Sequence, residues 1–153
     1  MAGTTLNFTI PAEPKPGDLR INEIMADPSP VVGLPEVEYI EIFNASDSII
    51  DLQGLILSKE STSTTLSTYL LGSNEQVVIV DANNLSLMSG FTAIGVSDLI
   101  SFSNNADSIV LKNADDQIID RVEYQSSWYG DDAKDNGGYS LELIDPTSSC
   151  TDE

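Results

Sequence analysis

The sequence predicts an all-β protein, an antiparallel β-sandwich of about eight strands. Short runs rich in Ile, Val, Leu and aromatic residues recur along the chain, and turn-forming Asn, Asp, Ser, Gly and Pro separate them. No long stretch repeats its apolar residues with the period of a helix. The chain has 153 residues, which suits one domain with a hydrophobic core.

Each apolar run between turn residues is expected to be one strand. In chain order these are LRINEIM (19–25), EYIEIFN (38–44), LQGLILS (52–58), TYLL (68–71), QVVIV (76–80), DSIVLK (107–112), QIIDRVEY (117–124) and YSLELI (139–144). The turn residues of KNADDQ (112–117) predict a hairpin between the two runs that they join. Residues 83–100 have a weaker pattern and are compatible with a short helical turn around Leu85–Met88.

The first residues are interpreted as a linker. TTLNFTI (4–10) alternates like a strand, and Pro11, Pro14 and Pro16 favour an extended polyproline conformation after it. Residues 1–18 are therefore expected to be the end of a preceding module plus a proline-rich linker. The alternative is an N-terminal strand that joins this domain's own sheet.

The domain itself is expected at residues 19–146, followed by a tail at 147–153 that contains the single cysteine, Cys150. That cysteine has no partner in the chain for a disulfide, and a partner outside it or a free thiol are both open. The first residues lack the basic and apolar regions of a signal peptide, so the chain is expected to come from a longer protein.

Composition excludes several classes of site and partner. The chain has 25 acidic and 6 basic residues, a net charge of −19, which repels nucleic acid and anionic membranes. No apolar run is long enough to span a bilayer, so membrane insertion is not expected. The absence of histidine excludes Ser-His-Asp and Cys-His catalysis and His-ligated metals. No cofactor is predicted.

Four segments together resemble the lamin tail domain family in its bacterial form: INEIMADP (21–28), EYIEIFNAS (38–46), DLQGLILS (51–58) and GGYSLELIDP (137–146). The chain differs from the usual family pattern at Tyr39, where Trp is common. The resemblance implies an immunoglobulin-like β-sandwich. It also implies a module of larger secreted or cell-surface bacterial proteins, without catalysis of its own.

Acidic pairs are candidates for glycosidase carboxylates, and one acidic loop is a candidate for calcium binding. Glu36 with Glu38, Asp115 with Asp116 and Asp131 with Asp132 lie in polar segments, whereas glycosidase chemistry requires two carboxyl groups across a cleft. The sequence therefore predicts no catalytic residue. The loop DDAKDNGG (131–138) has oxygen ligands suited to calcium, but Lys134 occupies a ligand position and no metal site is assigned. Whether Asp131–Asp135 binds calcium stays open.

Two groups of residues are predicted as a contact surface. Trp128 and Tyr129 follow the run 117–124. The sequence favours Trp128 folding back over the edge of the core, and its display to a sugar or a protein partner is the alternative. In EYIEIFN, the sequence favours Ile40 and Ile42 in the core. Tyr39, Glu41 and Phe43 are then expected to form a half-exposed aromatic strip, with Glu41 near Arg121.

These observations predict a non-catalytic accessory module of a larger extracellular bacterial protein, acting in adhesion, protein contact or spacing. Its expected partners are a protein or a carbohydrate at the cell surface and the neighbouring domains of the parent chain. A carbohydrate-binding or calcium-dependent binding module is the alternative. A domain that accompanies a hydrolase, with catalysis elsewhere in the parent chain, is the third interpretation.

Overall fold

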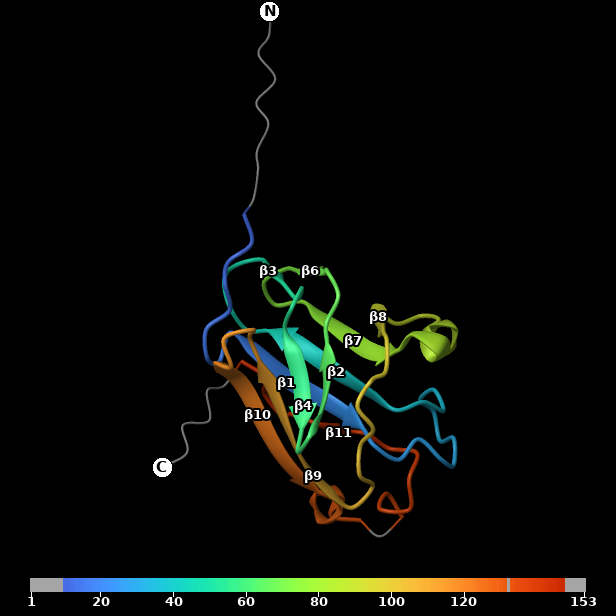
Figure 1. Cartoon of the computed structure of the whole chain (residues 1–153). Coiled ribbons are helices and arrows are strands. Elements are labelled where there is room, and N and C mark those ends of the chain that lie inside the picture. The colour runs from blue at the N-terminus through green and yellow to red at the C-terminus, as the bar shows by residue number, and fades with distance from the viewer. Residues whose placement is uncertain (1–9, 132, 148–153) are drawn as a thin grey trace, which may run out of the picture.

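The computed structural model describes residues 10–131 and 133–147, and it confirms the β-sandwich. The strands are β1 (Leu19–Met25), β2 (Tyr39–Asn44), β3 (Ile50–Asp51), β4 (Ile56–Lys59), β5 (Thr62–Thr65), β6 (Leu70–Leu71), β7 (Gln76–Asp81), β8 (Ala93–Val96), β9 (Ala106–Lys112), β10 (Ile118–Gln125) and β11 (Leu141–Glu142). Two 3₁₀ helices are η1 (Ala82–Met88) and η2 (Ser126–Tyr129). A five-stranded sheet, β11-β1-β2-β7-β8, packs against a four-stranded sheet, β10-β9-β4-β5, and β3 pairs with β6 (Figure 1).

Each of the eight predicted runs overlaps a strand, but the sequence pattern missed β3, β5 and β8. β5 is the polar segment TSTT, which pairs with β4 and carries no apolar period. One pair departs from the antiparallel pattern, because β8 pairs with β7 in parallel. η1 connects these two strands, and it contains the helical turn that the sequence predicts around Leu85–Met88.

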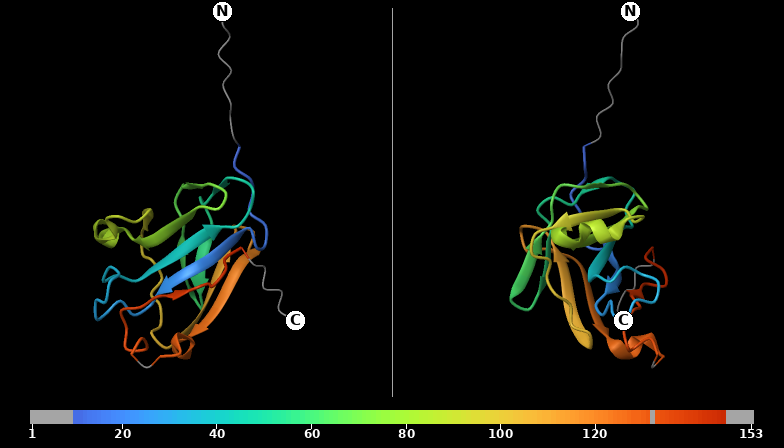
Figure 2. Two further views of the ribbon diagram at one scale, coloured as in Figure 1. Left: turned by 180° about the vertical axis from the view of Figure 1, so that it is seen from behind. Right: turned by 90° about the vertical axis from the view of Figure 1, so that its right-hand side faces the viewer.

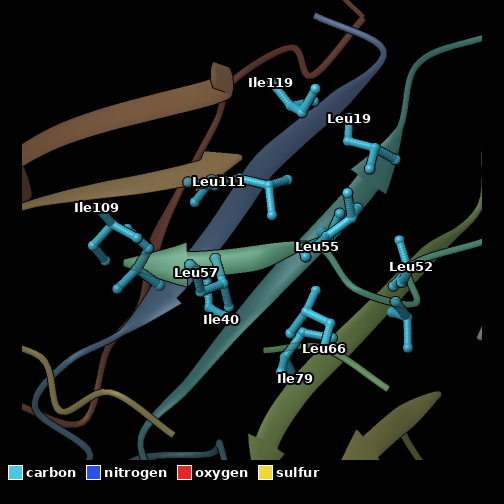
Figure 3. Packing of buried hydrophobic residues seen from close by; sticks show 14 of the residues in the cluster. Leu19, Ile40, Leu52, Leu55, Leu57, Leu66, Ile79, Ile109, Leu111 and Ile119 are labelled. Carbon is cyan, nitrogen blue, oxygen red and sulfur yellow. The ribbon is translucent and has the colours of Figure 1, made fainter. Parts of the chain in front are cut away.

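The main core lies between the two large sheets. Ile40 and Ile79 from the five-stranded sheet approach Leu57, Ile109 and Leu111 from the four-stranded sheet, and all five side chains are fully buried (Figure 3). The β-branched and leucine side chains alternate inward along these strands and fill the space between the sheets. The structure therefore confirms that Ile40 and its neighbour Ile42 face the sandwich interior.

The predicted hairpin joins β9 and β10. Asn113 accepts hydrogen bonds through its side chain from the N–H groups of Asp115 and Gln117, at 3.0 and 2.9 Å. Asp116 has a φ of 62°, a left-handed conformation that Asp adopts more readily than most residues. Its carboxylate lies 2.6 Å from the Nζ atom of Lys112. These contacts agree with the prediction of a turn at residues 112–117.

Part of the predicted linker contacts the domain. The N–H of Ala12 donates to the carbonyl of Ile49 at 2.8 Å, and the N–H of Gly17 donates to the carbonyl of Ile119 at 2.8 Å. Residues 10–11 then lead away from the sandwich at the end opposite η2 (Figure 1). The predicted strand at 4–10 and the tail with Cys150 lie almost wholly outside the described residues. Among the described residues, no helix has the length and apolar character needed to cross a bilayer.

Candidate interaction surface

An apolar groove runs along one side of the sandwich, between β10 and the paired strands β1 and β11. The left view of Figure 2 shows the ribbons of these three strands. Its volume is about 240 Å³. The groove is lined mainly by apolar side chains from both sheets and from η2: Ile21, Ile24, Val122, Tyr124, Trp128 and Leu141. We call this feature the edge groove.

The edge groove exists because both sheets end here. β10 is the last strand of one sheet and β11 the last strand of the other. Asp120 joins the two sheets at one end of the groove, since its carboxylate accepts the N–H of Ile21 at 2.7 Å and lies 3.4 Å from a guanidinium nitrogen of Arg20. Burial raises the pKa of Asp120, although the hydrogen bond from Ile21 and the charge of Arg20 oppose that rise.

Trp128 forms one end of the groove and remains 54% exposed. It lies in η2, which ends at Gly130 in a left-handed conformation with a φ of 61°. The adjacent Tyr129 is half-buried, and its hydroxyl donates to the carbonyl of Tyr139 at 2.9 Å. Burial raises the pKa of Tyr129. Trp128 is thus the displayed member of the predicted pair, and Tyr129 attaches η2 to the loop before β11.

The opposite side of the groove is formed by the last described strand and the residues after it. Leu143 donates its N–H to the carbonyl of Asn22 at 2.8 Å, which continues the pairing of β11 with β1. Leu143 is 38% exposed, and Ile144 is fully exposed. From the sequence, the run YSLELI (139–144) is predicted only as a strand. The run contains three aliphatic side chains, Leu141, Leu143 and Ile144, and the last two lie beyond the strand. Aliphatic residues that continue past the strand were the sequence signal for this side of the groove.

The predicted aromatic strip on β2 is not exposed. The exposed fractions of Tyr39, Glu41 and Phe43 are 1%, 6% and 7%, so the prediction that they form a half-exposed surface is wrong. A second apolar cluster covers this outer face of the five-stranded sheet, and Val37 and Met88 from the flanking segments belong to it together with Tyr39. β2 is the central strand of its sheet, and it is buried on both faces.

A sequence signal for this double burial was present. Residues 77–80 of β7, next to β2, form the continuous apolar run VVIV, and all four are buried. Strands that are covered on both faces have continuous apolar runs, whereas half-exposed strands alternate. The alternation in EYIEIFN hid the same property, because polar Glu41 and Asn44 occupy buried positions there.

Glu41 lies in a row of three glutamates across adjacent strands. Glu23 of β1 is the register partner of both Glu41 of β2 and Glu142 of β11. Burial raises the pKa of Glu41, and the charges of Glu23 and Glu142 raise it further, while a 2.7 Å hydrogen bond from the Asn22 amide opposes the rise. The expected contact with Arg121 is wrong: that arginine belongs to the other sheet and lies 3.7 Å from Glu123.

The acidic loop after η2 is organised by its own backbone. Asp131 accepts the N–H of Ala133 at 2.8 Å through its side chain, and its carbonyl accepts the N–H groups of Lys134 and Asp135. Asp132 lies outside the described residues. Within residues 10–131 and 133–147, no group of three acidic, histidine or cysteine side chains is placed to hold a metal ion.

The other acidic pairs lie in the turn between β9 and β10 and in the segment before β2. Asp115 and Asp116 form the β9–β10 turn, where Asp116 is paired with Lys112. Glu36 accepts a hydrogen bond from the hydroxyl of Ser29 at 2.7 Å. The carboxylate of Glu38 lies 3.3 Å from the N–H of Phe102, and burial raises its pKa. The carboxylates of Asp116, Glu36 and Glu38 therefore have structural contacts.

A larger hollow, of about 670 Å³, lies over β4, β9 and β10 and is polar. The two cations among its described lining residues are both paired: Lys59 lies 2.5 Å from Asp107, and Arg121 lies 3.7 Å from Glu123. The edge groove combines an exposed aromatic ring with apolar walls, which is the usual character of the centre of a protein interface. It is therefore the stronger candidate for a contact surface.

The comparisons with known proteins agree with the fold. No curated protein matches the chain significantly. The family model described as Lamin Tail Domain matches residues 12–126, which include β1 to β10. The chain therefore belongs to the lamin tail domain family, a family of immunoglobulin-like protein-interaction modules.

Proposed function

We propose that this domain is a non-catalytic module of a larger extracellular bacterial protein, and that it binds a protein partner through the edge groove. The observation that carries the proposal is the 54% exposed Trp128 at the end of a groove with apolar walls. Aromatic side chains in such positions supply a large share of binding energy at protein interfaces. The family's interaction role supports a protein partner.

An extracellular location fits the surface charge. With 25 acidic against 6 basic residues, the folded domain repels other acidic molecules and remains soluble at high salt. A partner that approaches this surface gains from being neutral or basic at its contact residues. The domain would then act as a contact or spacing element beside the other domains of its parent protein.

The test is selection of binders from a displayed random peptide library on the intact chain. Trp128→Ala and Phe91→Ala serve as the matched pair, because Phe91 is also a large exposed apolar residue, 44% exposed, outside the groove. We expect selected peptides to bind the Trp128→Ala variant at least about tenfold more weakly, a loss of about 1.4 kcal/mol, and to bind Phe91→Ala like the natural chain. Failure to select peptides, or selected peptides that tolerate Trp128→Ala, would contradict the proposal.

A carbohydrate ligand is the second candidate, since an exposed indole can stack on a sugar ring. An oligosaccharide array probed with the same three proteins separates the two. Sugar binding that disappears in Trp128→Ala, together with no selected peptide, would replace the protein partner with a carbohydrate.

A further inference from the structure

The free edge of β10 presents unpaired backbone groups beside the edge groove. β10 is the end strand of its sheet. Just after β10, the N–H of Ser126 donates to the carbonyl of Asn105, so it points toward β9. Within β10, the carbonyl of Ile119 accepts the N–H of Gly17, so it points away from β9. In a strand, the N–H and C=O of one residue point to the same edge, and successive residues point to opposite edges. The backbone groups of Glu123 and the N–H of Gln125 therefore point away from β9.

The free part of this edge begins beyond the contact that joins the sheets. The Asp120 carboxylate accepts a hydrogen bond from the N–H of Ile21, and the carbonyl of Ile119 accepts the N–H of Gly17, so that end of β10 is occupied. From Val122 onward, β10 turns alternate side chains toward the groove, Val122 and Tyr124 among them. A further strand placed against Glu123 and Gln125 would direct every second side chain into the same groove.

The other end strand of this sheet does not offer the same combination. β5 is also terminal, but it is the polar segment TSTT, and none of its residues lines the edge groove. At β10, main-chain hydrogen-bonding groups and an apolar groove with Trp128 occur side by side. Recognition of a peptide by strand addition uses both elements: the main chain supplies affinity, and pockets for alternate side chains supply specificity.

We propose that the edge groove and the free edge of β10 bind an extended segment of a partner protein as an added strand. The segment carries apolar side chains at alternate positions, with lysine or arginine beside them. This inference rests on the proposed function and specifies the partner that the groove accepts.

The negative charges around the groove favour a partner segment with basic residues. Glu142 lines the groove, the side chain of Glu123 on the free edge is 68% exposed, and the whole chain carries −19. Two copies would repel each other at this surface. The chain's own residues 148–153, SSCTDE, contain no aliphatic or aromatic side chain that could fill the groove. A basic segment with aliphatic residues is complementary in both respects.

The experiment uses capped heptapeptides with lysine at both ends, threonine at the second, fourth and sixth positions, and Ile, Val, Leu or Phe at the third and fifth. Binding to the full chain is followed by backbone amide resonances of Glu123 and Gln125 and by the indole resonance of Trp128. Two N-methylated versions of the best peptide block alternate amides, one version for each edge of the peptide strand. We expect one version to bind at least about tenfold more weakly and the other to bind like the parent, because an added strand bonds through one edge only.

A variant of the protein provides a second, independent measurement. Proline at position 123 removes an N–H that points to the free edge and leaves the hydrogen bonds of Val122 and Tyr124 to β9 in place. We expect Glu123→Pro to weaken peptide binding by about tenfold or more, as loss of a main-chain donor and a steric block require. If this variant fails to fold, the N-methylated peptides decide the matter. Peptides with glutamate at both ends should bind more weakly than the lysine peptides, and equal binding would overturn the basic partner.

Failure of this inference can be told from failure of the proposed function. Library peptides that depend on Trp128, together with equal binding of both N-methylated versions, would keep the protein-binding function and overturn strand addition. Self-association in sedimentation that Trp128→Ala abolishes would make a second copy the occupant. A change in Trp128 fluorescence on deletion of residues 1–9 would make the chain's own N-terminus the occupant. Sugar binding at the groove would overturn a protein occupant altogether.

Discussion

Glu41 is a carboxylate buried on the covered outer face of the five-stranded sheet, and its closest hydrogen-bond donor is the neutral amide of Asn22 at 2.7 Å. Because burial and two nearby glutamates disfavour its charge, removing that charge should cost little. We expect Glu41→Gln to change the free energy of unfolding by less than about 1 kcal/mol at pH 7. Truncation of its core neighbour, Ile40→Ala, should cost about 2–5 kcal/mol. Urea denaturation of both variants checks the order, and a larger loss for Glu41→Gln would show that the charge is required.

Asn44 is fully buried at the end of β2 and fixes the turn after it. Its amide nitrogen donates to the carbonyls of Ser48 and Leu71 at 2.8 and 2.9 Å, and its side-chain oxygen accepts from the N–H and hydroxyl of Ser46. We expect Asn44→Ala to destabilise the domain by about 2–4 kcal/mol, because the buried carbonyl of Leu71 loses its donor and the turn loses its other side-chain hydrogen bonds. The exposed Asn104 gives the control substitution, with an effect of less than about 0.5 kcal/mol. Thermal unfolding that finds equal effects would contradict this role.

At the scale of elements, the loop before β11 packs on the loop after β1 without room for side chains. Added Cβ atoms at Gly137 and Gly138 would lie 2.0 Å from the carbonyl oxygen of Ser29 and 2.1 Å from that of Pro30. Both glycines also have positive φ angles, 93° and 81°. This close approach was not predictable, because one sequence does not show which distant backbone a glycine will approach.

Two glycine-to-alanine substitutions separate the cost of the steric contact from the cost of the positive φ angle. Gly54 has a φ of 80°, and a Cβ there would meet no atom within 4 Å. We expect Gly54→Ala to cost about 1 kcal/mol for the angle alone, and Gly137→Ala to cost at least about twice that. Chemical denaturation of the two variants measures the difference. Equal costs would mean that the loops separate without penalty.

The sequence predicts a strand well when the strand's own apolar alternation reports its burial, and poorly when the strand depends on its neighbours. A strand with a one-sided apolar period, such as β9, was predicted close to its observed bounds, since alternation reflects the pleat itself. β5 was missed because its stability comes from pairing with β4. The edge groove was also missed, except for Trp128, because it is formed by residues of β1, β10 and β11 that meet only in the folded sandwich.

At the scale of the whole molecule, buried carboxyl groups link stability to pH. Burial raises the pKa of Glu38, Glu41 and Asp120 above ordinary values of 4.5 for glutamate and 3.8 for aspartate. Between those values and the raised ones, the folded state binds more protons than the unfolded state, so stability rises as pH falls. Relief of the −19 net charge acts in the same direction. We expect the melting temperature to increase from pH 7.5 to pH 5 and Glu41→Gln to reduce the slope; a decrease over this range would contradict the account.

β10 presents a free edge beside an apolar groove. Amide hydrogen exchange along β10 in the intact chain tests this most directly. The account predicts alternation: slow exchange at Val122 and Tyr124, which bond to β9, and fast exchange at Glu123 and Gln125, which point away from it. A peptide selected on the groove should then slow the amides of Glu123 and Gln125. Uniform protection along β10 in the free protein, or a bound peptide that leaves these two amides fast, would contradict the account.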